Sequence, residues 1–478
     1  MAERVAQEVA AALIGRLEAL PGVAELVRHL LRALHGQVPA AACFACGGLV
    51  RDLGLGAVHG TQVVLKDVDL MVDRASTASL QEIVGRLAQT CPALLHAENV
   101  GVAFPVWKLK LADLTEPVDL APARTGRSFG GGGATAQPSP AGLSLEDDAA
   151  HRDFTFNAMF VELKLTEDGR LRGTLHDPHG GLESIRRREI RCVGDADERL
   201  AEDPLRGLRG VRFAATLPGF ELHPSTLAAI QRHAPAVKGA LALDRLAGEL
   251  ARALSGDPHR ALAELERSGL AAAILPQLAA LGAVARARCA ARIRGVTERL
   301  GCEVEPAVVF AALLVELAVA RDAQPVTGLD RDVAEPWSIA GAELRRVTRE
   351  LRLPNLRRIW RLCSRVLVLG RYPGRLDFPE ARVEEALAGA GEGPQLLALY
   401  GAHQQALARD PVDLMAVLAT LPPSQLDFGR IVEQAGAAPG PRLATLRLAL
   451  RQAEIDGTIS DQAGAWALFD ELYQDRVP

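Results

Sequence analysis

The chain has 478 residues and a formal net charge of −5, and 49% of its residues are hydrophobic. A chain of this length exceeds a single hydrophobic core, so roughly two to four domains are expected, and the apolar content excludes wholesale disorder. Because the net charge is negative, the surface is not basic overall, and a nucleic-acid partner would have to bind a local basic region.

Three observations bear on the compartment. The seven cysteines are an odd number scattered through a long chain, which suits a reducing environment. Cys43 and Cys46 lack the second pair or nearby histidine of a zinc site, so buried free thiols are expected. No signal peptide is evident at the N-terminus, and no stretch offers about 18 uninterrupted apolar residues. We therefore expect a cytoplasmic protein with no membrane partner; the sequence carries no signal of its oligomeric state.

Apolar residues at helical spacing predict a helical segment over residues 3–35. A helix is also expected near 79–89. Strand-like runs separated by turns lie at 43–50, 63–72, 104–111, 117–121 and 154–165, the last of which could begin as a helix. After Gly181 the strand signals fade, and proline and glycine break the remaining chain into helices. The sequence thus predicts a small mixed α/β unit followed by a long α-helical remainder.

These changes of pattern suggest four domains. An N-terminal helical segment would occupy residues 1–36, and the mixed α/β unit, called the head, residues 37–175. A helical neck would follow at 176–275, and a helical body and tail at 276–478.

The stretch from 126 to 147 interrupts the head. Its glycine run, Gly130 to Gly133, and the prolines that follow cannot support regular structure. Two interpretations stay open: a disordered surface insertion, or a mobile loop between two strands of the head.

The most informative motifs lie between residues 47 and 69. Gly47 and Gly48 allow the backbone to approach a bulky anion without a Cβ atom in the way. Asp67 and Asp69 stand in an apolar run, and on a strand both carboxylates would point to the same face. Like charges forced together repel, and a divalent cation is the usual remedy. A phosphate cradle with paired carboxylates indicates metal-dependent phosphoryl or nucleotidyl transfer.

Asp119 is a candidate third acid. It lies between Val118 and Leu120 in a short predicted strand, and a buried Asp without a partner is costly. A position facing the same metal ions as Asp67 and Asp69 would explain it, because nucleotidyl transfer commonly uses two magnesium ions. The alternative for an isolated Asp-x-Asp is a solvated turn, but the apolar neighbours favour burial.

Two further polar blocks follow the glycine-rich stretch. Arg152, Asp153 and Asn157 are set among phenylalanines, a mixture more typical of the wall of a site than of a surface. A capped helix start with a salt bridge is the alternative.

The second block is Glu202-Asp203-x-x-Arg206. If the chain is helical from Glu202 onward, Asp203 and Arg206 share a face. They could then form an ordinary helix salt bridge, or hydrogen-bond the Watson–Crick edge of a base as acceptor and donor.

Ten arginines lie between 345 and 375, with Glu350 as the local acid. Such a run is commonly a solvated face, but in a net-acidic protein it favours a surface that binds RNA phosphates. The candidate RNA-binding residues are Arg345, Arg346, Arg349, Arg357, Arg358 and Arg361.

With these blocks in order, the chain resembles the class II tRNA nucleotidyltransferase and bacterial poly(A) polymerase family. The resemblance covers about half the chain, from about Cys43 to about Pro276. It implies an α/β nucleotidyltransferase head, a small mixed β-sheet with helices, followed by a long all-α neck, body and tail. It is carried by Gly-Gly-x-Val-Arg-Asp at 47–52, Asp-x-Asp at 67–69, Asp119, Arg-Asp-Phe-Thr-x-Asn-Ala at 152–158 and Glu-Asp-x-x-Arg at 202–206.

The resemblance also implies residue roles. Magnesium ions would be bound by the catalytic acids Asp67, Asp69 and Asp119. The triphosphate would be held by Gly47, Gly48 and Arg51. The ribose would be met by the motif that contains Arg152, Asp153 and Asn157. Asp203 and Arg206 would pair with the base of ATP or CTP, with Glu202 orienting the arginine.

The implied activity is template-independent addition of CCA to tRNA 3′ ends from CTP and ATP. A poly(A) polymerase is the nearest alternative, although the Arg-Arg-Phe segment typical of that subgroup is absent around 94–101. A CC-only or A-only enzyme stays open because the loop is glycine-rich. A non-catalytic RNA-binding relative would require a lost carboxylate, and all three are present. His151 replaces an arginine common in the family, which makes one positive charge conditional on pH.

Overall fold

The computed structural model describes most of the first two-thirds of the chain and parts of the rest. The described residues are 2–63, 67–101, 105–124, 142–237, 243–301, 304–322, 359, 362–363, 366, 384, 393–406, 416, 419–421, 423–435 and 441–474. The chain divides into two compact units, one of residues 1–242 with 267–273 and one of 243–266 with 274–478. The finer domain boundaries expected from the sequence stay predictions.

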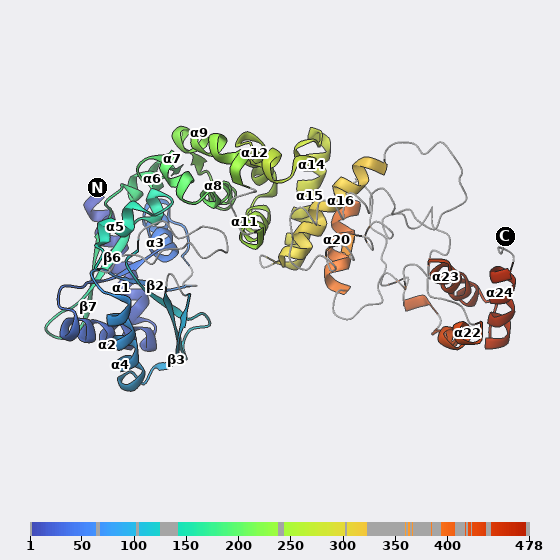
Figure 1. Cartoon of the computed structure of the whole chain (residues 1–478), viewed down its shortest axis with the longest axis horizontal. Helices are drawn as coiled ribbons and strands as arrows, with labels where there is room; N and C mark the ends of the chain where they lie inside the picture. The colour runs from blue at the N-terminus through green and yellow to red at the C-terminus, as the bar shows by residue number, and fades with distance from the viewer. Residues whose placement is uncertain are drawn as a thin grey trace. The chain divides into compact units, whose positions relative to one another are not determined.

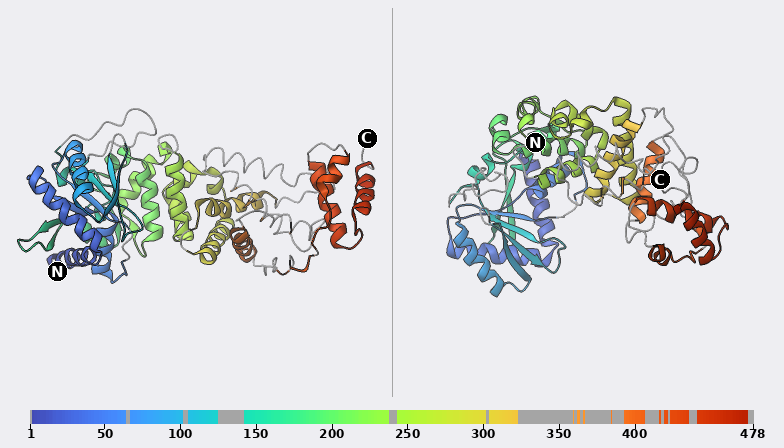
Figure 2. Two further views of the ribbon diagram at one scale, coloured as in Figure 1. Left: turned by 90° about the horizontal axis from the view of Figure 1, so that it is seen from below. Right: turned by 45° about the vertical axis from the view of Figure 1, so that its right-hand side comes forward.

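The N-terminal unit contains one large mixed sheet with helices beside it (Figure 1, Figure 2). Its strand order is β3-β4-β5-β2-β1-β6-β7. Neighbours run antiparallel except for β2 and β5, which are parallel. The strands are β1 (Cys43–Cys46), β2 (Asp69–Val72), β3 (Leu94–Val100), β4 (Val106–Leu111), β5 (Val118–Pro122), β6 (Phe160–Leu165) and β7 (Leu171–His176).

The N-terminal helices confirm the predicted periodicity. The expected segment is two helices, α1 (Ala2–Glu18) and α2 (Pro21–Gln37), because Pro21 begins a new helix at its first position. Helix α4 (Thr77–Thr90), capped by the Ser76 side chain, matches the helix expected near 79–89. Helix α1 packs on β7, and α2 packs on α4. Cys43 and Cys46 are buried free thiols, as expected.

Several predicted strand limits were wrong. The run at 43–50 is a strand only to Cys46, because Gly47 turns the chain into helix α3 (Gly48–His59). In the run at 63–72 the strand begins only at Asp69. The run at 154–165 opens as a 3₁₀ turn, Thr155–Asn157, before β6. The sequence missed β3 and β7, the two edge strands, where polar, exposed residues hide the alternation.

Helices dominate the rest of the N-terminal unit. The short strands β8 (Glu189–Ile190) and β9 (Glu221–Leu222) form a separate parallel pair. The helices are α5 (Leu145–Ala150), α6 (Gly181–Arg187), α7 (Ala196–Glu202), α8 (Leu205–Thr216) and α9 (Pro224–His233), with a 3₁₀ turn at Ala234–Ala236. The helix expected from Glu202 onward is wrong in one respect. Helix α7 ends at Glu202, Asp203 is extended with φ −146° and ψ 99°, and α8 begins after Pro204.

The second unit is helical throughout its described part, as the sequence predicts. Its helices are α11 (Leu243–Ser255), α12 (Pro258–Arg267), α13 (Leu270–Ile274), α14 (Pro276–Ala279), α15 (Ala283–Leu300), α16 (Pro306–Asp322), α20 (Gly393–Ala406), α22 (Phe428–Ala435), α23 (Pro441–Ile455) and α24 (Gln462–Gln474), of which α12 and α13 include residues of the N-terminal unit. Helix α15 packs against α16 and α20. At that junction the fully buried Arg292 forms an ion pair of 2.8 Å with the fully buried Glu316.

No helix in the described ranges is long and apolar enough to cross a membrane. The candidate RNA-binding arginines between 345 and 361, and residues 126–141 of the glycine-rich stretch, lie outside the described residues.

An aromatic cluster joins the head to the helices of the neck. Phe156 stacks on Phe154, with ring centroids 5.7 Å apart, and meets Phe213 edge-on at 5.1 Å and Phe220 at 6.0 Å. These rings come from the 3₁₀ turn after α5, from α8 and from the segment before β9, and all are buried. Their packing therefore fixes α8 against the polar residues at 151–157.

Candidate active site

Asp69 and Asp119 face each other across the parallel strands β2 and β5. Their Cα atoms are register partners, and on the other side of β2 the partner of Asp69 is Cys46. Because alternate residues share a sheet face, Asp69 and Asp119 lie beside Met71 and Ala121 on one side of the sheet. A pocket on this side has as its polar lining Cys46, Asp69, Asp119, Arg124, Asp148 and Arg152.

Nearby positive charges offset the negative charge of the carboxylate pair only in part. Burial, and then the charge of Asp119, raise the pKa of Asp69, against the opposing effect of Arg152. One oxygen of Asp119, Oδ2, accepts a hydrogen bond of 2.7 Å from Lys108 Nζ. Its other oxygen, Oδ1, is buried and finds no partner among the described residues. An unpartnered carboxylate oxygen beside a second crowded carboxylate fits a divalent cation, which prefers such oxygen ligands.

Asp67 lies two residues before Asp69, just outside the strand, and is exposed. The Val68 carbonyl between them accepts a hydrogen bond of 2.9 Å from the Asp119 N–H, and the charge of Asp67 adds to the causes that raise the pKa of Asp69. Across the described chain, no three His, Cys, Asp or Glu side chains gather closely enough to hold a metal ion. Of the three predicted ligands, Asp69 and Asp119 are cross-strand partners, and Asp67 lies at the exposed start of β2.

Gly47 lies directly against Asp69. Its φ is +74°, a conformation that favours glycine, and a Cβ atom there would lie 2.6 Å from Asp69 Oδ2. Gly48 begins α3, whose first N–H groups form a positive helix terminus at this point. Arg51, in the first turn of α3, forms an ion pair of 2.7 Å with Asp52 and lies 5.3 Å over the Phe213 ring.

Arg152 is held in the pocket by three contacts. Its Nε donates to Asp148 Oδ1 at 2.7 Å and its Nη2 to Cys46 Sγ at 3.4 Å, and its guanidinium lies 4.9 Å over the Phe160 ring. Burial alone would lower the pKa of Arg152, but Asp148 and then Cys46 raise it overall. The charge of Arg152 is thus permanent, and it opposes the rise in the pKa of Asp69.

Asp153 is buried, and its two carboxylate oxygens accept hydrogen bonds from neighbouring protein groups. Oδ2 accepts from Arg209 Nη2 at 2.6 Å, and Oδ1 accepts from Asn157 at 3.0 Å and from the Phe154 N–H at 2.8 Å. Burial opposes ionisation, yet Arg209 and these hydrogen bonds lower the pKa of Asp153 to about 2. Asn157 Oδ1 in turn accepts from Arg51 at 3.4 Å. These bonds connect α3, the 3₁₀ turn and α8 in one polar chain.

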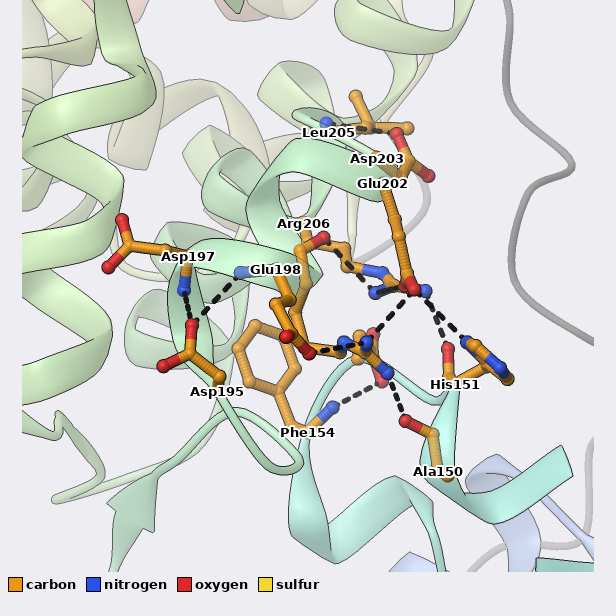
Figure 3. Close-up of polar contacts among 12 residues, drawn as sticks. Ala150, His151, Phe154, Asp195, Asp197, Glu198, Glu202, Asp203, Leu205 and Arg206 are labelled. Atoms are coloured by element: carbon orange, nitrogen blue, oxygen red, sulfur yellow. Dashed lines mark hydrogen bonds and ion pairs between the residues drawn. The ribbon is translucent and has the colours of Figure 1, made fainter. Parts of the chain in front are cut away.

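Glu202 is the centre of the polar network that Figure 3 shows. Its oxygens meet His151 Nδ1 at 3.1 Å, Arg199 Nη2 at 2.9 Å and Arg206 Nη1 at 2.8 Å. Arg206 Nη2 also donates to the His151 carbonyl at 2.6 Å, and the Arg206 N–H donates to the Asp203 carbonyl at 3.0 Å. Both Asp203 and Arg206 are buried. The Arg206 guanidinium is therefore held in a single orientation.

Four residues that hold the site were not predicted from the sequence. Lys108, Asp148, Arg199 and Arg209 hold Asp119, Arg152, Glu202 and Asp153 respectively. Arg209 follows Arg206 by three positions in α8, and this spacing could have identified it. The other three depend on strand pairing and helix packing that no local pattern reveals.

Known families match both the head and the neck. Residues 43–191 match the family described as the poly A polymerase head domain, and residues 219–281 the probable RNA and SrmB-binding site of polymerase A. The CCA-adding enzyme of Geobacillus stearothermophilus is 35% identical over 236 residues, 49% of this chain and 50% of that protein. The chain belongs to the class II tRNA nucleotidyltransferase and poly(A) polymerase family.

Other family members agree. The multifunctional CCA protein of Ralstonia nicotianae is 35% identical over 239 residues, 49% of each chain, so the chain spans about half the length of these relatives. The crystal structure of the Bacillus stearothermophilus CCA-adding enzyme with CTP has a TM-score of 0.60 at 23% identity, covering 94% of this chain and 97% of that one. The structure of the Thermotoga maritima CCA-adding enzyme with tRNA has a TM-score of 0.55 at 18% identity, and the match covers 94% of each chain. These structures confirm the predicted fold, a mixed sheet followed by helices.

The crowding of Asp69 makes a prediction about stability. The pKa of the Asp69 carboxyl is higher in the folded state than its usual value of 3.8, so the ionised carboxylate destabilises the fold at neutral pH. This penalty declines as pH falls through the folded-state pKa and is absent below 3.8. In metal-free buffer at pH 7, Asp69→Asn should therefore raise the Tm by about 2–4 °C, equivalent to about 1 kcal/mol. The gain should shrink toward pH 4.

Differential scanning fluorimetry over this pH range provides the measurement. Asp67→Asn is the matched control, because the exposed Asp67 should give a smaller shift. A Tm gain for Asp69→Asn that stays constant down to pH 4 would contradict the crowding argument.

Gly47 gives a second prediction, with Gly60 as its matched control. Gly60 has φ +69° but nothing within 4 Å of an added Cβ. Alanine at either position should lose about 1 kcal/mol or more of unfolding free energy from backbone strain. Gly47→Ala should lose more, because only its Cβ meets a side-chain oxygen. Urea denaturation checks this, and equal losses would mean that Asp69 turns away without cost.

Proposed function

We propose that this protein adds CCA to the 3′ ends of tRNA, using CTP and ATP, by metal-dependent nucleotidyl transfer without a template. The observation that carries the proposal is the carboxylate pair Asp69 and Asp119, with its unpartnered buried oxygen, beside the glycine turn at Gly47. Related proteins support it, since solved structures of similar CCA-adding enzymes contain CTP, ATP or tRNA.

Asp69 and Asp119, with Asp67, would hold Mg²⁺. When bound, the metal would stabilise negative charge on the attacking and leaving oxygens. Asp119 would offer its unpartnered Oδ1 to the cation, while Lys108 keeps its hydrogen bond to Oδ2. Asp67 would have to approach from its exposed position before β2. The neighbouring Arg152, permanently charged, would offset part of the negative charge of Asp69 without a change of protonation.

The triphosphate would lie at the start of α3. Gly47 and Gly48 keep side chains away from the first N–H groups of this helix, which attract anions. Arg51, in the first turn of the same helix, supplies a guanidinium for the phosphates. Arg152, Asp153 and Asn157 would contact or position the ribose, with Asp153 fixed by Arg209.

Asp203 and Arg206 would read the base. Arg206 presents donors and Asp203 acceptors, the pair needed to hydrogen-bond a Watson–Crick edge. Glu202 and the His151 carbonyl hold the Arg206 guanidinium, which favours selection over general attraction to anions.

Further partners follow from the same proposal. The arginines between residues 345 and 375 would bind the phosphates of the tRNA. We expect the protein to act in the cytoplasm. Poly(A) addition and CC-only or A-only addition use the same carboxylates and remain alternatives. A non-catalytic RNA-binding role is disfavoured by the presence of all three acids.

One assay separates these functions. Purified protein, Mg²⁺ and each labelled NTP are combined with tRNA transcripts ending before CCA, after C or after CC. Two C additions followed by one A are expected. Long A tails on arbitrary RNA would identify a poly(A) polymerase, products that stop at CC or need a preformed CC a partial enzyme, and no incorporation a non-catalytic relative.

Asp69→Ala should abolish this incorporation, because half of the carboxylate pair is lost. The rate should fall on the order of a thousandfold or more, while tRNA affinity in a filter-binding assay stays within a few-fold. Glu82→Gln, an exposed change on α4, controls for handling and should keep full activity. Persistent activity of Asp69→Ala would remove this carboxylate pair from the mechanism.

A further inference from the structure

His151 contacts both Glu202 and Arg206 with different atoms. It caps the C-terminus of α5, where the head meets α7 and α8. The His151 side chain meets Glu202 through Nδ1 at 3.1 Å, and its carbonyl accepts from Arg206 Nη2 at 2.6 Å. Figure 3 shows the imidazole and the carbonyl directed at the same pair of residues. The position of His151 is thus coupled to the proposed base-reading arginine in two ways.

Glu202 divides its oxygens between one histidine and two arginines. Oε1 meets both His151 and Arg199, whereas Oε2 meets Arg206. The Glu202 side chain is 15% exposed and that of Arg206 6%, so water screens this pair weakly. A positive charge on His151 adds to the attraction at Oε1 and competes with Arg206 for the same carboxylate.

Histidine is the residue type that changes charge within the physiological pH range. Asp147, in the first turn of α5, also interacts electrostatically with the His151 imidazole. Two hydrogen bonds from Ser144 are the main causes that lower the pKa of Asp147, and His151 adds to them. The charged groups around His151 are Asp147 and Arg152 along the chain, Arg199 and Glu202 of α7, and Arg206 of α8. Arginine and carboxylate side chains ordinarily keep their charges between pH 6 and pH 8.

We propose that His151 is a positioning residue through which pH tunes the choice between CTP and ATP. When neutral, His151 donates one hydrogen bond to Glu202 and leaves Oε2 to Arg206. When protonated, it draws Glu202 toward Oε1 contacts and loosens the hold on the Arg206 guanidinium. This inference rests on the proposed base-reading function of Arg206 and adds a titratable control to it.

Two variants separate charge from hydrogen bonding. His151→Asn keeps an N–H group near the position of Nδ1 but cannot become charged. His151→Arg carries a positive charge at every pH used. A third variant, His176→Gln, is the matched control: His176 meets Glu162 at 3.1 Å between β6 and β7, an equivalent pair elsewhere in the head.

The measurement is kcat/KM for CTP on tRNA ending before CCA and for ATP on tRNA ending in CC, from pH 6 to pH 8.5. The wild-type ratio of the two constants should change about threefold across this range, the effect of one partly exposed ion pair. In both His151 variants the ratio should not change with pH. In His151→Asn it should stay near the value that the wild type has at alkaline pH, and in His151→Arg near the value that the wild type has at acidic pH. His176→Gln should keep the wild-type profile.

A structural role alone would lower both constants together without changing the pH profile of their ratio, and that result would overturn the proposal. So would a wild-type profile in His151→Asn. Calorimetric titration of CTP and ATP into the protein without RNA separates this inference from the proposed activity. If RNA is not extended, the activity fails, while the affinity ratio still tests His151. If RNA is extended, but neither the ratio of kcat/KM values nor the ratio of CTP and ATP affinities depends on pH, only the inference about His151 fails.

Discussion

The site depends on two carboxylates held together by main-chain hydrogen bonding. Asp69 and Asp119 are partners in the one parallel pairing of the sheet, so the β2–β5 ladder keeps their backbones side by side. Lys108 offsets part of their charge from β4, and Arg152 lies near Asp69 from beyond α5. The buried, unpartnered oxygen of Asp119 beside Asp69 is the part of this face that suits a cation, whereas Arg124 and Arg152 in the same pocket supply positive charge.

The recognition half of the site is attached to this face by packing rather than by a flexible connection. The stacked rings of Phe154 and Phe156 meet Phe213 of α8, and Asp153 bonds Arg209 one turn earlier in the same helix. Arg206 lies on that helix too. A shift of α8 would therefore disturb aromatic packing, a low-pKa ion pair and the Glu202 network together. The position of the proposed base reader is consequently determined by the core of the unit.

Much of this arrangement could be predicted from the order and type of residues. Glycine at Gly47, the acids Asp69 and Asp119, and Arg206 with Glu202 were identified because each is chemically unusual in its local surroundings. The exposure of Asp67 could not be predicted, since apolar neighbours suggested a strand that begins only at Asp69. The extended conformation of Asp203 could not be predicted, because helical periodicity does not show that one helix ends at Glu202 and another begins after Pro204. Long-range partners such as Lys108 and Asp148 depend on strand order and on the packing of α5, which no short window contains.

The contact between Gly47 and Asp69 also restricts how this gene can change. Every other amino acid carries a Cβ atom, and at this position that atom would meet a carboxylate oxygen that the proposed chemistry needs. A single missense change in this one codon therefore affects the backbone and the acid at once, with no conservative substitution to fall back on. Neighbouring positions can drift among similar side chains, whereas this position offers natural selection no intermediate step.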